Sequence, residues 1–190
     1  MTESDQAGDR AHLTVMLKRW SGGDAGAGDD VLALVYDRIR QLAASRLRAA
    51  GHAPLQPTEL VNELMINLLE ADVDWQDRSH FFRTVAVAMR NILHDLGRRQ
   101  SAVKHGGGQL RVTLGAAEGE ASESSSDAES LHEALLALRE NDPRKADVIE
   151  LTYLVGLDHN EVAKTLGVSL ATVNRDLRFA HAWIRQRLTD

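Results

Sequence analysis

The sequence predicts an all-α protein, built from two small helical domains that a flexible linker joins. Apolar residues recur at helical spacing on both sides of the middle of the chain, with few of the alternating β-branched runs that mark strands. Residues 106–130, by contrast, are rich in glycine, serine and acidic side chains and are too polar to form a core. The 190 residues leave room for two small domains. We therefore expect one domain at residues 1–105 and another at 131–190.

The first section is expected to hold four helices. A glycine-rich stretch at residues 22–28 separates the first two. Thr58 is the expected N-cap of the third helix, with Glu59 at its positive end, and the fourth helix begins near Ser79. The periodic apolar positions of the second and third helices are Val31, Leu34, Val35, Ile39, Leu42 and Leu47, and Leu60, Val61, Leu64, Met65, Leu68 and Leu69.

The C-terminal section is expected to begin with an amphipathic helix at about residues 129–140. The sequence Asn141-Asp142-Pro143 breaks this helix, because proline cannot continue it. A second helix then runs to Gly156.

Residues 158–175 have the spacing of a helix-turn-helix, whose second helix presents its first side chains to the major groove of DNA. Asp158 and Ser169 are expected to cap the two helices, and Gly167 supplies the backbone freedom that the turn requires. An ordinary helical hairpin with the same caps is the simpler alternative. Arg and Asn can contact base edges, and Ser and Thr suit bases or phosphates. The side chains expected to contact DNA are Ser169, Leu170, Ala171, Thr172, Asn174, Arg175 and Arg178.

The composition argues against catalysis. No cysteine is present, which excludes a disulfide framework, a thiolate zinc site and a cysteine nucleophile. The eight histidines show no metal-binding spacing such as HExxH, and the run Gly106-Gly107-Gly108 lacks the Gly-Lys-Ser/Thr that completes a phosphate-binding loop. We expect no catalytic residue, no metal and no cofactor.

The net charge of −6 argues at first against a nucleic-acid partner. It divides, however, into −1 for residues 1–105, −4 for 106–130 and −1 for 131–190, so most of the acidity lies in the linker. Basic stretches remain on either side, and local contact with DNA is expected, although weak for the free protein. No apolar run approaches the roughly 18 residues of a membrane span, and no export signal opens the chain. We expect a cytoplasmic protein that has no membrane partner.

Four segments carry a family resemblance that covers nearly the whole chain. They are residues 55–63 (LQPTELVNE), 75–82 (WQDRSHFF), 88–93 (AMRNIL) and 168–183 (VSLATVNRDLRFAHAW). In this order they resemble the extracytoplasmic-function (ECF) branch of bacterial sigma factors.

The resemblance implies a sigma factor that binds core RNA polymerase and directs promoter recognition, DNA melting and transcription initiation. Residues 1–105 would be sigma region 2, and residues 131–190 would be sigma region 4, which reads the minus-thirty-five element of promoter DNA. The third helix would dock on a coiled coil of the largest polymerase subunit through Glu59, Asn62, Glu63 and Asn67. The residues implied at the minus-ten element are Trp75, Arg78, Arg90, Asn91, His94, Arg98 and Arg99.

Several alternatives stay open at this point. Trp75 is either a residue that stacks on an extruded base or an anchor of the core, and the core interpretation is favoured. Thr58 is either a phosphorylation switch for a Ser/Thr kinase or a plain N-cap, while many ECF factors are instead held by an anti-sigma factor. The competing function is a stand-alone helix-turn-helix regulator that binds duplex DNA without polymerase.

Overall fold

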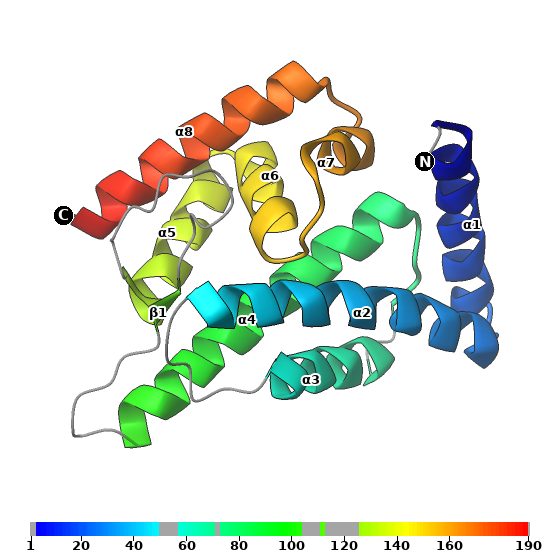
Figure 1. The fold of residues 1–190 in the computed structure, drawn as a ribbon, viewed down its shortest axis with the longest axis horizontal. Helices are drawn as coiled ribbons and strands as arrows, with labels where there is room; N and C mark the ends of the chain where they lie inside the picture. Colours follow the sequence, from blue (N-terminus) through cyan, green and yellow to red (C-terminus); the bar gives the residue numbers. More distant parts are fainter. Residues whose placement is uncertain (1–2, 50–56, 71–72, 104–110, 113–125, 190) are drawn as a thin grey trace.

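The computed structural model describes residues 3–49, 57–70, 73–103, 111–112 and 126–189. These residues form eight helices and one pair of two-residue strands, which confirms the expected all-α class (Figure 1). The elements are, in chain order, α1 (Glu3–Ser21), α2 (Ala25–Ala49), α3 (Pro57–Glu70), α4 (Arg78–Val103), β1 (Arg111–Val112), β2 (Ser126–Asp127), α5 (Ala128–Asn141), α6 (Pro143–Tyr153), α7 (His159–Leu166) and α8 (Leu170–Thr189). None of the described helices is both long and apolar enough to cross a membrane.

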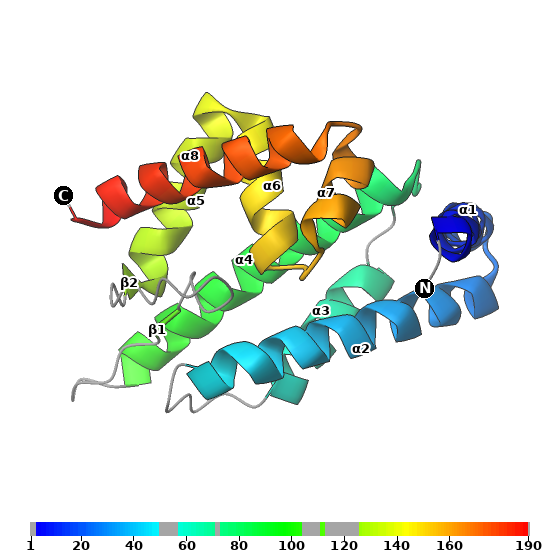
Figure 2. The ribbon, with the colours of Figure 1, turned by 45° about the horizontal axis from the view of Figure 1, so that its top comes forward.

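Helix α4 lies in the middle of the molecule. On one side it packs against α1 and α3, and on the other side it packs against α5, α6 and α7. Figure 2 shows α4 between the pair α2 and α3 and the C-terminal helices, with α8 on the outside. The buried apolar residues of the N-terminal half (α1 to α4) and the C-terminal half (α5 to α8) form one continuous core. The two halves of the chain are therefore packed together in this structure.

Most of the segment expected to be a linker, residues 106–130, lies outside the described residues. Its described ends pair as antiparallel strands, Arg111 opposite Asp127 and Val112 opposite Ser126. No pattern in the sequence predicts this pairing. Helix α5 begins at Ala128, three residues before the start of the expected C-terminal domain.

Three aromatic rings hold the loop before α4 onto the end of α1. The Trp75 side chain is 2% exposed, and its ring centroid lies 5.4 Å from that of Trp20 and 5.1 Å from that of Phe81. The backbone N–H of Trp75 also donates a 2.8 Å hydrogen bond to the Ser21 hydroxyl oxygen. These contacts place Trp75 in the core.

Two details of α2 and α3 differ from the sequence expectation. Helix α3 begins at Pro57, so Thr58 is its second residue and not its N-cap. Proline is well suited to a first helical position, because its fixed φ matches the helix and the missing N–H would have no helical partner there. Leu34 and Leu69, both at periodic apolar positions, are 54% and 59% exposed, because only the centre of each apolar stripe reaches the core.

Replacing Trp75 with alanine is expected to lower the free energy of unfolding by about 3–5 kcal/mol, since a large buried ring leaves a cavity. Phe179→Ala is the control, because Phe179 is half exposed and its loss should cost about 1 kcal/mol or less. Urea denaturation of both variants measures the difference. Equal stability of Trp75→Ala and the wild type would contradict the core assignment.

Candidate nucleic-acid interface

Helices α7 and α8 are joined by a short turn with well-defined caps. Asp158 forms a capping box with Glu161: the Asp158 carboxylate accepts from the Glu161 N–H at 2.8 Å, and the Glu161 carboxylate accepts from the Asp158 N–H at 2.9 Å. Gly167 ends α7 with φ of 68°, in the left-handed region where a side chain would be strained. Ser169 accepts from the Thr172 N–H at 3.1 Å. The expected caps and turn are confirmed.

The start of α8 presents the expected DNA-contacting residues together. Ser169 and Thr172 lie next to each other, with their hydroxyl oxygens 2.9 Å apart. The inward positions Val162, Val173 and Leu177 are buried, which fixes the direction of the outer face. Thr172 is half-buried, and the exposed members of the set are Ser169, Leu170, Ala171, Asn174, Arg175 and Arg178.

An inward carboxylate holds α8 in place. Asp176 is 1% exposed and accepts a 2.8 Å hydrogen bond from Nε of Arg144 on α6. This hydrogen bond and the charge of Asp176 raise the pKa of the Arg144 guanidinium. Asp176 was not among the residues predicted from the sequence, although its place between Val173 and Leu177 on the inner face is a sign that it needs a partner.

The residues expected at the minus-ten element divide between two faces of α4. Asn91 and Arg98 are exposed. Arg90 and His94 instead point toward the C-terminal helices, where Arg90 pairs with Glu150 of α6 and Nε2 of His94 lies 3.0 Å from Glu129 of α5.

The remaining members of the minus-ten set lie near the ends of α4. The Arg78 guanidinium stacks over the Phe82 ring and lies 3.7 Å from the Glu161 carboxylate of α7. Arg99 belongs to α4, but its side chain lies outside the described residues. Trp75 is in the core, so its ring is not accessible to a base in this conformation.

Five charged side chains meet where α4, α5 and α6 pack, and we call them the charge cluster. Arg83 and Arg90 come from α4, Arg139 from α5, and Asp147 and Glu150 from α6. Asp147 accepts from Arg83 at 2.8 Å and from Arg139 at 2.9 Å, while Glu150 accepts from Arg139 at 2.7 Å and from Arg90. Burial acts to lower the pKa of Arg139, but the two carboxylates outweigh burial and raise it. Arg139 therefore keeps its charge although it is half-buried in this contact.

A pair of stacked histidines lies beside the charge cluster. The rings of His94 on α4 and His132 on α5 are 4.0 Å apart and inclined by 19°. Burial lowers the pKa of His132, and the nearby positive charges of His94 and Arg90 lower it further, whereas Glu129 and Asp95 act in the opposite direction.

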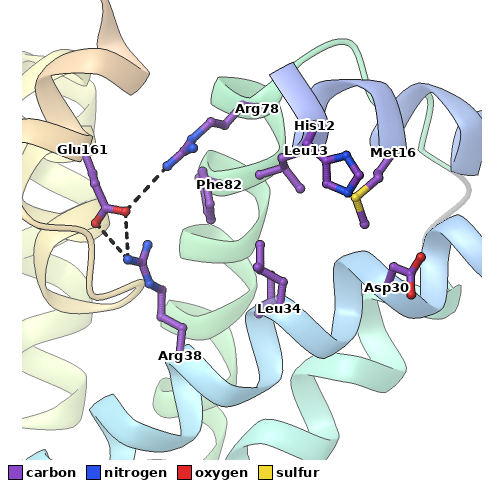
Figure 3. Close-up of a pocket in the computed structure, with 10 residues that line it drawn as sticks. His12, Leu13, Met16, Asp30, Leu34, Arg38, Arg78, Phe82 and Glu161 are labelled. Atoms are coloured by element: carbon purple, nitrogen blue, oxygen red, sulfur yellow. Dashed lines mark hydrogen bonds and ion pairs between the residues drawn. The ribbon is translucent and has the colours of Figure 1, made fainter. Parts of the chain in front are cut away.

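A second contact between the N-terminal and C-terminal halves borders a cavity of about 450 Å³ between α1, α2, α4 and α7 (Figure 3). Arg38 of α2 donates to both carboxylate oxygens of Glu161 at 2.8 and 2.9 Å, and the Arg78 guanidinium lies 3.7 Å from Oε1 of the same carboxylate. Within the described part of the chain, no group of three or more His, Asp or Glu side chains could hold a metal ion. The cavity is lined by His12, Leu13, Met16, Asp30, Leu34, Val35, Arg38, Arg78, Phe82 and Glu161.

The outer face of α3 carries the residues expected to contact polymerase. Glu59, Asn62 and Asn67 are exposed, and Glu63 is half-buried. Two apolar side chains lie on the same helix, Ile66 at 53% and Leu69 at 59% exposure, and the sequence analysis did not assign either to the site.

The chain matches the family model described as ECF sigma factor over residues 10–190. It therefore belongs to the ECF sigma factor family and acts as a sigma factor in transcription initiation. Members of this family are DNA-binding proteins that work with core RNA polymerase, promoter DNA and anti-sigma factors. No curated protein sequence matches the chain at a significant level.

The stability of the protein is expected to fall as the pH falls below about 6.5, partly through His132. Its pKa in the folded protein lies below the ordinary value of 6.5, so protons bind the unfolded chain more tightly. The stabilisation is complete above pH 6.5 and is lost toward the lower, folded-state pKa. His132→Gln should flatten this dependence, as urea denaturation between pH 5 and 8 would reveal. His12→Gln, at an exposed histidine, is the control, and identical slopes for both variants and the wild type would contradict the assignment.

Proposed function

We propose that this sigma factor recognises both promoter elements and opens the DNA between them, with α8 reading the minus-thirty-five element and α4 contacting the minus-ten element. We further propose the functional division expected from the sequence, with residues 1–105 as sigma region 2, 106–130 as linker and 131–190 as sigma region 4. The observation that carries the proposal is the exposed group of polar side chains at the capped start of α8.

The chemistry of the α8 residues suits the edges of bases in the major groove. Arg175 can make a bidentate contact to guanine, and Asn174 can make one to adenine. Leu170 and Ala171 suit the methyl group of thymine. Ser169 lies at the positive end of the helix, where phosphate oxygens are favoured.

For the minus-ten element we propose contacts along α4. Arg78, Arg90, Arg98 and Arg99 would bind phosphates of the opened strand, with Asn91 and His94 beside them. Holding an opened strand also requires a place for unstacked bases. We leave Trp75 out of this role, because its ring is part of the core.

For polymerase binding we propose the outer face of α3. Glu59, Asn62, Glu63 and Asn67 suit a basic, polar surface on the largest polymerase subunit. The exposed Ile66 and Leu69 add apolar area, which is common at the centre of protein interfaces.

Regulation by phosphorylation of Thr58 is a further hypothesis, alongside control by an anti-sigma factor. The exposed Thr58 lies in the first turn of α3, where a phosphate adds negative charge next to unpaired backbone N–H groups. Equal polymerase affinity of the wild type, Thr58→Ala and Thr58→Glu would contradict a switch. The comparison needs no kinase, because glutamate supplies the negative charge.

The function is tested by mixing the protein with core RNA polymerase that lacks a sigma factor and mapping transcripts from the native DNA. A stable complex with new start sites is expected. Leu69→Ser should weaken the complex about fivefold or more, since it removes apolar contact area at the interface. The control is Leu136→Ser on α5, where a leucine is also exposed. Binding to duplex DNA without any binding to core polymerase would favour the stand-alone regulator, which the exposure of the α8 residues also permits.

Arg175→Ala is expected to reduce transcript yield about tenfold or more from the mapped promoter, because one good base contact is lost. Binding to core polymerase should not change. Arg185→Ala is the matched control, since Arg185 is an exposed arginine farther along the same helix. Equal losses from both variants would indicate a general charge effect and not base reading.

A further inference from the structure

We propose that the packing of α5, α6 and α7 on α4 is an autoinhibited state of the free protein, in which the C-terminal half covers part of the strand-binding face of α4. This inference rests on the proposed role of α4 at the minus-ten element. It assigns a regulatory function to residues that are not among the proposed DNA or polymerase contacts: Arg83, Arg139, Asp147, Glu150 and Glu161.

Arg90 is occupied in this state. Its side chain is 7% exposed, and it pairs with Glu150, whose side chain is fully buried. Glu150 also accepts from Arg139 of α5, so a carboxylate held by its own half of the molecule fills the place that a DNA phosphate would take. No phosphate can reach the Arg90 guanidinium while α6 stays on α4.

His94 is covered in the same way. Its side chain is 15% exposed, its ring stacks on His132, and the Glu129 carboxylate lies 3.0 Å from Nε2. Positions 83, 90 and 94 are seven and four residues apart, which places them on one face of the helix. Asn91 and Arg98, also seven residues apart, lie on a neighbouring face that remains exposed.

The packing of the halves covers only some of the proposed binding surfaces. The start of α8, with Asn174, Arg175 and Arg178, remains exposed, so reading of duplex DNA is not blocked. The outer face of α3 also remains open, because α3 lies on the other side of α4 from α5 and α6 (Figure 2). Core polymerase can therefore engage α3 in the closed state, and the covered face of α4 becomes available when the halves separate.

Ion pairs supply part of the contact between the halves, beside the apolar core that the halves share. A buried ion pair contributes little net stability relative to the same two groups separated in water, because desolvation offsets most of the Coulomb attraction. The pairs at the edge of the contact are partly exposed: Arg83 to Asp147, and Arg38 and Arg78 to Glu161. Salt screens exposed pairs of this kind. A charged partner such as polymerase can likewise compete for them.

The double variant Arg83→Gln/Glu161→Gln tests the proposal. It removes the charge from one side of all three edge pairs and leaves the net charge unchanged. The amide that replaces the Glu161 carboxylate retains an oxygen that can accept from the Asp158 N–H, so the capping box of α7 is kept. Asp147 keeps Arg139 as its partner. The control is Arg19→Gln, which breaks a 2.7 Å ion pair to Asp24 within the N-terminal half.

Energy transfer between two dyes reports the closure directly. Because the chain has no cysteine, Ala33→Cys on α2 and Gln186→Cys on α8, both at exposed positions, give two labelling sites. High transfer is expected for the wild type and the control at low salt. Lower transfer is expected for the double variant, and for the wild type as NaCl rises toward 1 M, which tests the closure without any substitution at the contact.

Binding of a labelled 20-nucleotide oligo(dT) reports the accessibility of α4. If the open fraction rises tenfold, the apparent affinity for the single strand should rise about tenfold in the double variant, and it should not change in the control. Unchanged transfer in the double variant and at high salt would overturn the closure. Lower transfer without tighter oligo(dT) binding would overturn the autoinhibition, because the uncovered face would then not bind the strand. Failure to bind core polymerase would instead count against the proposed function alone.

Discussion

The burial of α4 on both sides is the constraint on which the rest of the structure depends. One face carries Phe81, Phe82, Val85 and Ile92, which are almost fully buried. Another carries Arg83, which stays partly exposed, and Arg90, which is buried and would be costly to bury without a partner. The carboxylates of α6 pair with these guanidinium groups, so the C-terminal half can pack on this polar face of the helix.

The charge cluster determines the relative orientation of the two halves more than it stabilises the folded protein. The halves share an apolar core, and the ion pairs of the charge cluster add contacts in which desolvation offsets much of the attraction. Asp147 and Glu150 each accept from one arginine of α4 and from Arg139 of their own half. The C-terminal carboxylates thus keep a partner when the halves separate, and α4 recovers its free guanidinium groups. A contact of this kind favours one closed geometry and still permits opening.

The two regions proposed to contact DNA differ in their exposure. The start of α8 is exposed, and the helix is held by Ser169 at its entry and by the buried Asp176 on its inner face. The corresponding residues of α4 are divided between an exposed face and a covered one. In a sigma factor this difference matches the order of events, because duplex DNA is read before a strand is available to bind.

The sequence by itself determined what depends on neighbours a few residues apart. Apolar spacing predicted the helices, and Asp158, Gly167 and Ser169 predicted the caps and turn before α8, because capping and left-handed backbone are local properties. It also favoured a core position for Trp75, which the structure confirms. The prediction that Thr58 is the N-cap was wrong, since the helix begins at Pro57, two residues earlier than a Thr58 cap implies.

Only the tertiary structure decided which of the predicted site residues are accessible. Arg90 and Glu150 are separated by 60 residues and Arg38 and Glu161 by 123, so no local pattern could pair them. The exposure of Ile66 and Leu69 likewise depends on how far the neighbouring helices extend over α3. A helix carries its polar and apolar faces in its sequence, but whether a polar face contacts water, DNA or another helix is decided by the packing of the whole chain.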